Sequence, residues 1–186
     1  MCWSDLRKSG RYFLSADRAF PKERGGWREP LRFLLLLQAV SSVLTTIALF
    51  TLFPLLVPTF PVPLLGIESF LSALIGNYLI FLVLTLAWAF WLHLWVALLG
   101  GRAGLLPTVR SVVYGSSPRF WFLWVPLASF FFILWAAVNT AIGLRAQRFS
   151  AGRAIGAVAL AVLIALLIVG GLALLIGPEL LALAAV

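Results

Sequence analysis

Long apolar runs, separated by short segments that hold most of the charge, are the main pattern of this chain. The core of a bilayer is about 30 Å thick and takes roughly 20 apolar residues per helix, so the runs at 31–53, 70–99 and 154–176 each predict a membrane-spanning helix. Prolines at positions 54, 58, 61 and 63 exclude a helix from the loop after the first span. The pattern therefore predicts an all-α, polytopic membrane protein.

The apolar stretch at 111–144 has two interpretations, because Pro118 and Pro126 interrupt it. A single span at 120–144 would place the three arginines at 145–153 opposite the N-terminal segment. Two short spans with a tight turn near Pro126 return these arginines to the N-terminal side. Short loops rich in Lys and Arg stay in the cytoplasm, so we predict a bundle of five transmembrane helices whose third and fourth helices are short and broken.

Charge and composition agree with this topology. Apolar residues make up 63% of the chain and charged residues 11%, and the mean hydropathy is +1.09, values typical of an integral membrane protein. The net charge is +8, and with five spans every Lys and Arg except Arg119 lies on the N-terminal side. The expected partners are thus the lipid bilayer and its anionic headgroups, and no nucleic acid. The expected topology has a cytoplasmic N-terminus and a C-terminus outside.

The leader at 1–30 is basic and precedes a membrane domain at 31–186. Apolar side chains recur in it at helical spacing, namely Trp3, Leu6, Phe13 and Leu14. This spacing predicts a short amphipathic helix that lies in the membrane interface. Gly10 falls in its middle, so a partly disordered basic tail is the alternative.

The polar residues in the predicted spans indicate no catalytic chemistry. His93 is the sole histidine and no carboxylate falls inside a span, so we predict no metal site, no cofactor and no enzymatic activity. His93 and Asn139 suit hydrogen bonds between helices, with proton or ligand chemistry as the alternative for His93. Tyr114 lies where a kinked helix is expected. Arg119, beside Pro118, is the basic residue left at membrane depth and needs shelter there.

Small residues indicate where helices approach closely. Gly152 and Gly156 form a small-xxx-small step at the start of the last span, and Gly143 is a further candidate for helix packing. Packing inside the bundle and contact with a second copy or a membrane-protein partner are both open. An aromatic run at 120–135 is interpreted as interfacial anchoring of the hairpin between the third and fourth helices.

The centre of the chain resembles the Yip domain family, multi-span membrane proteins named for interacting with Ypt/Rab GTPases, in its prokaryotic branch. The resemblance rests on these residues, in this order: His93, Leu99, Gly100, Gly101, Thr108, Val109, Arg110, Tyr114, Ser116, Ser117, Pro118, Pro126, Trp135, Ile142, Gly143, Leu144, Arg145, Ser150, Arg153 and Ala154. It implies five membrane helices with a cytoplasmic N-terminus, in a prokaryotic cell membrane. The leader lacks the long cytoplasmic region and the aromatic and glycine motifs of eukaryotic members, so a GTPase partner is not carried over.

The expected function is that of a non-enzymatic, Yip-like scaffold or adaptor concerned with membrane shaping or trafficking. The alternative is a small transporter, channel or lipid-moving protein. That alternative would use a polar path near His93 and Arg119.

Overall fold

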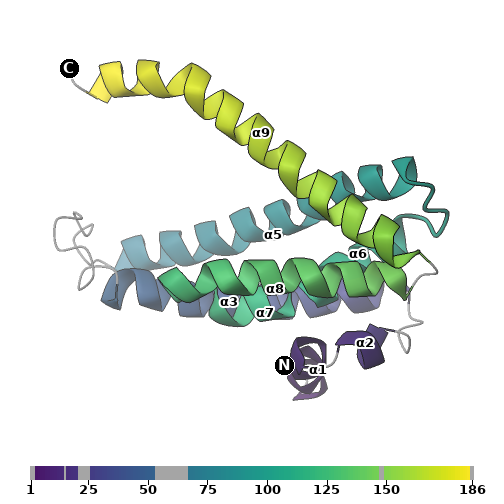
Figure 1. Cartoon of the computed structure of the whole chain (residues 1–186). Helices are drawn as coiled ribbons and strands as arrows, with labels where there is room; N and C mark the ends of the chain where they lie inside the picture. Colours follow the sequence, from purple (N-terminus) through teal and green to yellow (C-terminus); the bar gives the residue numbers. More distant parts are fainter. Residues whose placement is uncertain (1–2, 15, 21–25, 53–66, 147–148, 185–186) are drawn as a thin grey trace.

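The computed structural model describes residues 3–14, 16–20, 26–52, 67–146 and 149–184, and within these ranges the chain is helical with no strand. Its helices are α1 (Trp3–Leu14), α2 (Ala16–Ala19), α3 (Arg28–Thr51), α5 (Ile67–Leu98), α6 (Leu105–Gly115), α7 (Ser117–Phe122), α8 (Pro126–Arg145) and α9 (Ala151–Ala184) (Figure 1). The predicted all-α class is confirmed for this part of the chain. The proline-rich loop after the first span lies outside the described residues.

Four of the described helices are long and apolar enough to cross a membrane: α3, α5, α8 and α9. The predicted count of five is not confirmed by length and composition, because the remaining segment is divided between α6 and α7. The prediction of a broken fourth helix is not confirmed either, since α8 runs for 20 residues without interruption. Pro126 lies in the first turn of α8, where its missing N–H and fixed φ are tolerated, so this proline starts the helix and does not break it.

The division between α6 and α7 follows from Pro118. In a continuous helix its N–H would donate to the carbonyl oxygen of Tyr114, but proline has no N–H. The hydroxyl of Ser117 donates to that carbonyl instead, at 2.7 Å. Pro118 then occupies the first turn of α7, so the chain resumes a helical path after a local break.

The end of α5 is set by two glycines. Gly100 has φ +87°, a backbone conformation that favours glycine. Its N–H donates to the carbonyl of Ala97 at 3.0 Å, and the N–H of Gly101 donates to that of Val96 at 2.8 Å, which is the hydrogen-bond pattern of a Schellman motif. The helix therefore ends abruptly, as predicted. Its start is earlier than predicted, because Glu68 lies in the first turn of α5 and not in the preceding loop.

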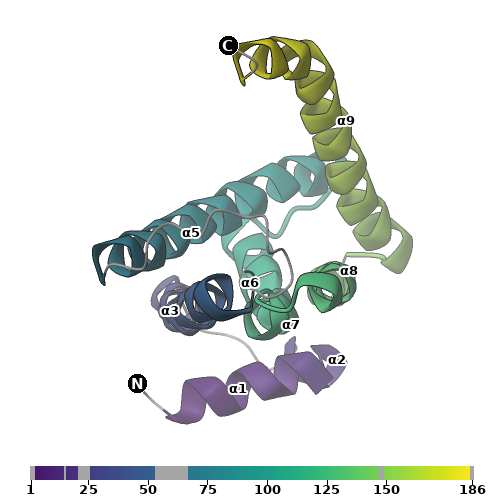
Figure 2. The ribbon, with the colours of Figure 1, turned by 90° about the vertical axis from the view of Figure 1, so that its left-hand side faces the viewer.

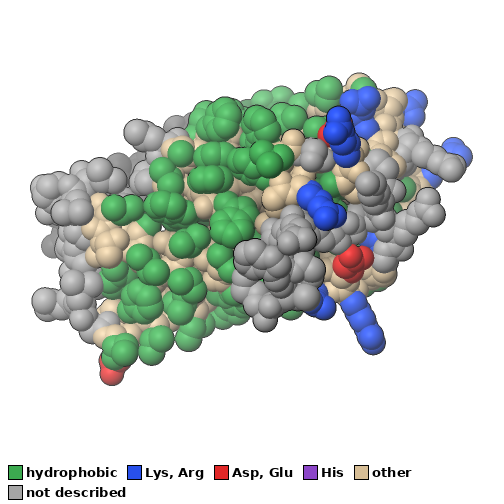
Figure 3. All heavy atoms as spheres, turned by 90° about the horizontal axis from the view of Figure 1, so that it is seen from below, with side chains coloured by type: hydrophobic (Ala, Val, Ile, Leu, Met, Phe, Trp, Pro, Cys, Tyr) green, Lys and Arg blue, Asp and Glu red, His purple; other side chains and the backbone are tan. Residues whose placement is uncertain are grey.

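The loops after α5 and after α8 meet at one end of the bundle. Arg102 and Arg153 line the same cleft there, and a Cβ placed on Gly100 would lie 3.6 Å from an Nη of Arg153. Lys and Arg side chains gather at this end of the face in Figure 3, which we call the basic end, while apolar side chains cover the rest of that face. The chain therefore reverses between α7 and α8, as the interpretation with two segments requires. Arg148 lies outside the described residues.

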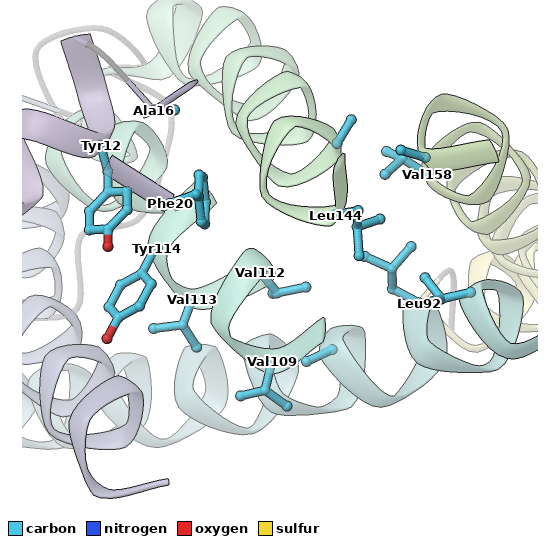
Figure 4. Close-up of a cluster of buried hydrophobic side chains, with 14 of the residues drawn as sticks. Tyr12, Ala16, Phe20, Leu92, Val109, Val112, Val113, Tyr114, Leu144 and Val158 are labelled. Carbon is cyan, nitrogen blue, oxygen red and sulfur yellow. The ribbon is translucent and has the colours of Figure 1, made fainter. Parts of the chain in front are cut away.

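The helices pack around a buried core from which α9 diverges. Side chains of α5, α6, α8 and α9 meet in this core (Figure 4), including Leu92, Val112, Leu144 and Ala157, each no more than 1% exposed. The two ribbon views agree that α9 starts beside α8 and then leans away from the bundle (Figures 1 and 2). Its apolar side chains at 166–169 are 49–65% exposed, so the side chains described there face lipid.

Candidate functional site

The N-terminal helix α1 is held on the bundle by aromatic stacking. The rings of Tyr12 and Tyr114 lie parallel, 4.6 Å apart and inclined by 3°, and both side chains are fully buried. Phe33 meets Tyr114 edge-on at 4.8 Å and Phe20 meets Tyr12 at 5.1 Å. We call these four residues the aromatic cluster. Figure 4 shows Tyr12 on α1 and Phe20, directly after α2, both directed towards Tyr114 on α6.

Polar side chains of α7 and α8 complete this attachment. The side-chain amide of Asn139 donates to the carbonyl of Tyr12 at 3.0 Å, and the indole N–H of Trp135 donates to that of Phe13 at 3.3 Å. Both carbonyls belong to the last turn of α1, a part of a helix whose carbonyls commonly accept hydrogen bonds from side chains. Trp121 adds a hydrogen bond to the hydroxyl of Ser9 at 3.0 Å. Part of the aromatic run at 120–135 thus contacts α1, which the sequence did not indicate.

The attachment fixes where α1 crosses the bundle. Asn139 and Trp135 precede Arg145, the last residue of α8, by six and ten residues. At 1.5 Å per residue these distances are about 9 Å and about 15 Å along the helix. In Figure 2, α1 runs across the bundle beneath α3 and α7, and α2 lies beneath α8. This helix therefore lies crosswise about two to three helical turns inward from the basic end.

Arg119 lies in α7 and reaches α5. One of its Nη atoms donates to the hydroxyl of Thr85 at 2.7 Å, and that hydroxyl donates in turn to the carbonyl of Phe81 at 2.7 Å. The guanidinium carbon is 5.2 Å from the centre of the Phe120 ring. Its Nε is buried without a hydrogen-bond partner, and no carboxylate of the described residues pairs with it. The sequence singled out Arg119 but not its partner Thr85. A lone hydroxyl in an apolar run was the only sequence feature that could have indicated Thr85.

A cavity of about 330 Å³ opens beside Arg119. Its walls come from α5, α8 and α9 and from the junction of α6 and α7. Most of the lining is apolar, and the polar side chains in it are Arg119, Ser116, Thr140 and the indole of Trp88. The cavity therefore combines one cation with an apolar wall.

His93 does not belong to this cavity. Its Nδ1 lies 3.1 Å from the hydroxyl oxygen of Thr108, so it links α5 to α6. Along α5 it is eight residues from Thr85, or about 12 Å. The structure thus brings Tyr114 and Asn139 together at α1, and Pro118 and Arg119 together at the start of α7, while His93 stands apart.

A second cleft, which the sequence did not predict, lies at the basic end. It measures about 480 Å³ and is lined by Arg102, Arg153, Ser150 and the turn at Gly100 and Gly101. Arg102 belongs to the loop after α5 and Arg153 to the first turn of α9, so the two arginines are far apart in sequence. The lining can accept an anion such as a lipid phosphate.

The glycines predicted for helix packing differ in their surroundings. A Cβ on Gly143 would lie 2.7 Å from the Phe20 ring and 2.8 Å from the Ser111 hydroxyl. A Cβ on Gly152 would meet nothing within 4 Å, and on Gly156 only a Leu99 methyl at 3.9 Å. Contact of Gly152 with a partner stays a prediction. The sequence missed Gly115, where a Cβ would come within 2.6–2.9 Å of Thr140 side-chain and backbone atoms.

These helices, with their apolar outer surfaces, define an integral membrane protein of the polytopic α-helical class. Residues 10–173 match the family model of the Yip1 domain, which covers most of the chain from α1 into α9. The protein belongs to the Yip1 domain family, and the resemblance noted in the sequence is confirmed. No curated protein and no solved structure matches the chain.

Proposed function

We propose that the protein crosses the membrane five times and that α6 and α7 together form the third crossing. Their 18 residues at 105–122 span about 27 Å at 1.5 Å per residue, close to the thickness of a bilayer core. The chain enters α6 from the basic end and leaves α8 at the basic end. The helices α6 and α7 lead from the basic end to the start of α8, which lies at the opposite end. If α8 crosses the membrane, α6 and α7 therefore cross it as well.

The basic end faces the cytoplasm in this proposal. The charge supports it, because short loops rich in arginine stay on the cytoplasmic side. The leader then starts in the cytoplasm, and with five crossings the chain ends outside. The last turn of α1 is then held by Asn139 in the half of α8 nearer to the cytoplasm.

The function we propose on this topology is that of a non-enzymatic scaffold or adaptor, which holds a membrane-protein partner or a second copy against anionic lipid. The observation that carries it is the convergence of Arg102, from the loop after α5, and Arg153, from the first turn of α9, on one cleft at the basic end. Membership of the Yip1 domain family also supports it.

Crosslinking in native membranes tests this role. Wild-type protein is expected to give a homo-oligomer or one reproducible partner, and the double variant Arg102→Gln with Arg153→Gln is expected to give less of it. The single variant Glu68→Gln, a charge change in the first turn of α5, serves as the control. A strictly monomeric protein with no partner, or equal crosslinking in the double variant, would contradict the proposal.

A second candidate function, the movement of ions or lipids, is favoured by the cavity beside Arg119. Liposomes with the purified protein would then show flux above empty vesicles. Arg119→Ala should lower it, whereas His93→Ala should not, because His93 lies outside the cavity lining. Flux equal to that of empty vesicles removes this candidate.

A further inference from the structure

We infer that the cavity beside Arg119 binds a single-chain lipid that ends in an acid group, with the guanidinium holding the acid and the chain lying along α9. This site goes beyond the scaffold function and does not depend on it. Nor does it require that the lipid be moved across the membrane.

The charge of Arg119 is the first support. Arginine carries five N–H donors and stays protonated in proteins, yet among the described residues the Arg119 side chain makes one hydrogen bond, to Thr85, beside its contact with the Phe120 ring. Its Nε is buried without a partner. A cation withdrawn from water without a counter-ion is strongly unfavourable. A carboxylate or phosphate would offset it and can engage a guanidinium through two parallel hydrogen bonds.

The depth of Arg119 is the second support. Its partner Thr85 lies 13 residues from Leu98 and 18 residues from Ile67, the two ends of α5. These intervals are about 20 Å and about 27 Å along the helix. The guanidinium is therefore well inside the span, and an anion carried by a lipid reaches that depth more readily than an anion dissolved in water.

The shape and lining of the cavity are the third support. Its wall on α8 includes Ile133, Ala136 and Ala137, and its wall on α9 includes Val162 and Val169. Ile133 and Val169 are also 45% and 65% exposed on the outer surface. The wall is thus continuous with the surface that faces lipid, so a chain can enter from the side between α8 and α9.

The volume limits the kind of lipid. About 330 Å³ lies at the lower end of small-ligand sites, which span roughly 300–1,000 Å³. This space suits one acid group and part of one chain better than a large headgroup with two chains. A long-chain fatty acid has this chemistry.

A photoreactive fatty acid tests the site in the full-length protein, reconstituted in phosphatidylcholine nanodiscs. Adducts mapped by mass spectrometry are expected on α8 and α9 around the cavity. Arg119→Gln should reduce this labelling about tenfold or more, because it removes the charge-assisted hydrogen bonds. Arg119→Lys should retain part of the labelling. Arg153→Gln, which removes a basic side chain of the other cleft, should leave it unchanged.

Competition separates the lipid from other anions. Unlabelled oleic acid should abolish the adducts, whereas methyl oleate and inorganic phosphate should not. Equal competition by methyl oleate would overturn recognition of the acid, and competition by phosphate would show that the site takes a soluble anion. Val162→Trp, which fills the cavity but keeps Arg119, should block labelling in a protein with wild-type circular dichroism. Unchanged labelling in Arg119→Gln or in Val162→Trp also overturns the inference.

Discussion

At the scale of single residues, glycines set how closely the helices approach, and one serine supplies a hydrogen bond at a helix break. Gly115 lets α6 lie against the backbone of α8 at Thr140, and Gly143 leaves room for the ring of Phe20. Ser117 satisfies the carbonyl that Pro118 leaves without a donor. These side chains act by size or by one hydrogen bond, so single substitutions test them directly.

Gly115→Ala is expected to destabilise the protein. Its Cβ would overlap Thr140 Oγ1 at 2.6 Å and the Thr140 backbone nitrogen at 2.7 Å, and because backbone atoms are involved, α6 and α8 must move apart. Overpacking of this kind costs about 1–3 kcal/mol. Thermal unfolding in detergent should show a lower Tm.

The matched control is Gly76→Ala in α5, where a Cβ meets nothing within 4 Å. Alanine is favoured over glycine inside a helix by roughly 1 kcal/mol, so the Tm should stay equal or rise. A Tm for Gly115→Ala as high as that of Gly76→Ala would show that the close approach of α6 and α8 is not required.

At the scale of elements, the attachment of α1 joins the basic leader to the membrane helices. The aromatic cluster supplies the buried contact, and Asn139 and Trp135 supply donors to the last turn of α1. Aromatic pairs contribute about 0.5–1.5 kcal/mol beyond the area that they bury. The part of the leader that forms α1 therefore belongs to the packed structure. The division into a leader at 1–30 and a membrane domain at 31–186 stays a prediction from sequence.

Asn139→Leu should loosen α1. The substitution leaves the carbonyl of Tyr12 without its donor, and a hydrogen bond between membrane helices contributes about 0.6 kcal/mol on average and up to about 1.7 kcal/mol. Hydrogen exchange of the amides in α1 is therefore expected to be about 3- to 20-fold faster, as followed by mass spectrometry.

Asn77→Leu is the control, because Asn77 donates to Thr46 and joins α5 to α3. It should not change exchange in α1. If both variants loosen α1 equally, the effect is global and the local attachment is not supported.

At the scale of the whole molecule, the path of the chain decides on which side each basic loop lies. Because Arg102, in the loop after α5, and Arg153, in the first turn of α9, share one cleft, these two arginines lie on one side of the membrane in any crossing that α5, α8 and α9 make. The two short helices α6 and α7 lead the chain from the basic end to the start of α8, and α8 then returns it to the basic end.

Cysteine accessibility tests the path in intact cells. In a Cys2→Ser background, cysteines at positions 18, 102 and 153 should react from the same side, and a cysteine at position 68 from the other. The reason is that 102 and 153 lie at the basic end, while Glu68 lies at the opposite end of α5. Labelling of position 153 together with position 68 would contradict the path and the proposed five crossings.

Much of the fold could be predicted from local sequence properties. The apolar runs located α3, α5 and α9, and the glycine pair located the end of α5, because hydropathy and backbone freedom belong to the residues themselves. The positive-inside rule favoured the reversal near Pro126 that the structure shows. The predicted turn near Pro126 agrees with the start of α8 at this proline, whereas a break within the fourth helix is not confirmed.

The contacts between distant residues could not be predicted. Helices such as α5 and α9 are apolar all round, so their sequences do not say which face packs and which meets lipid. The partner of Arg119, the donors that hold α1 and the close approach at Gly115 depend on the rotation and spacing of helices far apart in the chain. The sequence determined which runs are apolar enough to enter the membrane and which short segments carry the cations. Only the tertiary structure decided which side chains meet between them, because that depends on packing over the whole bundle.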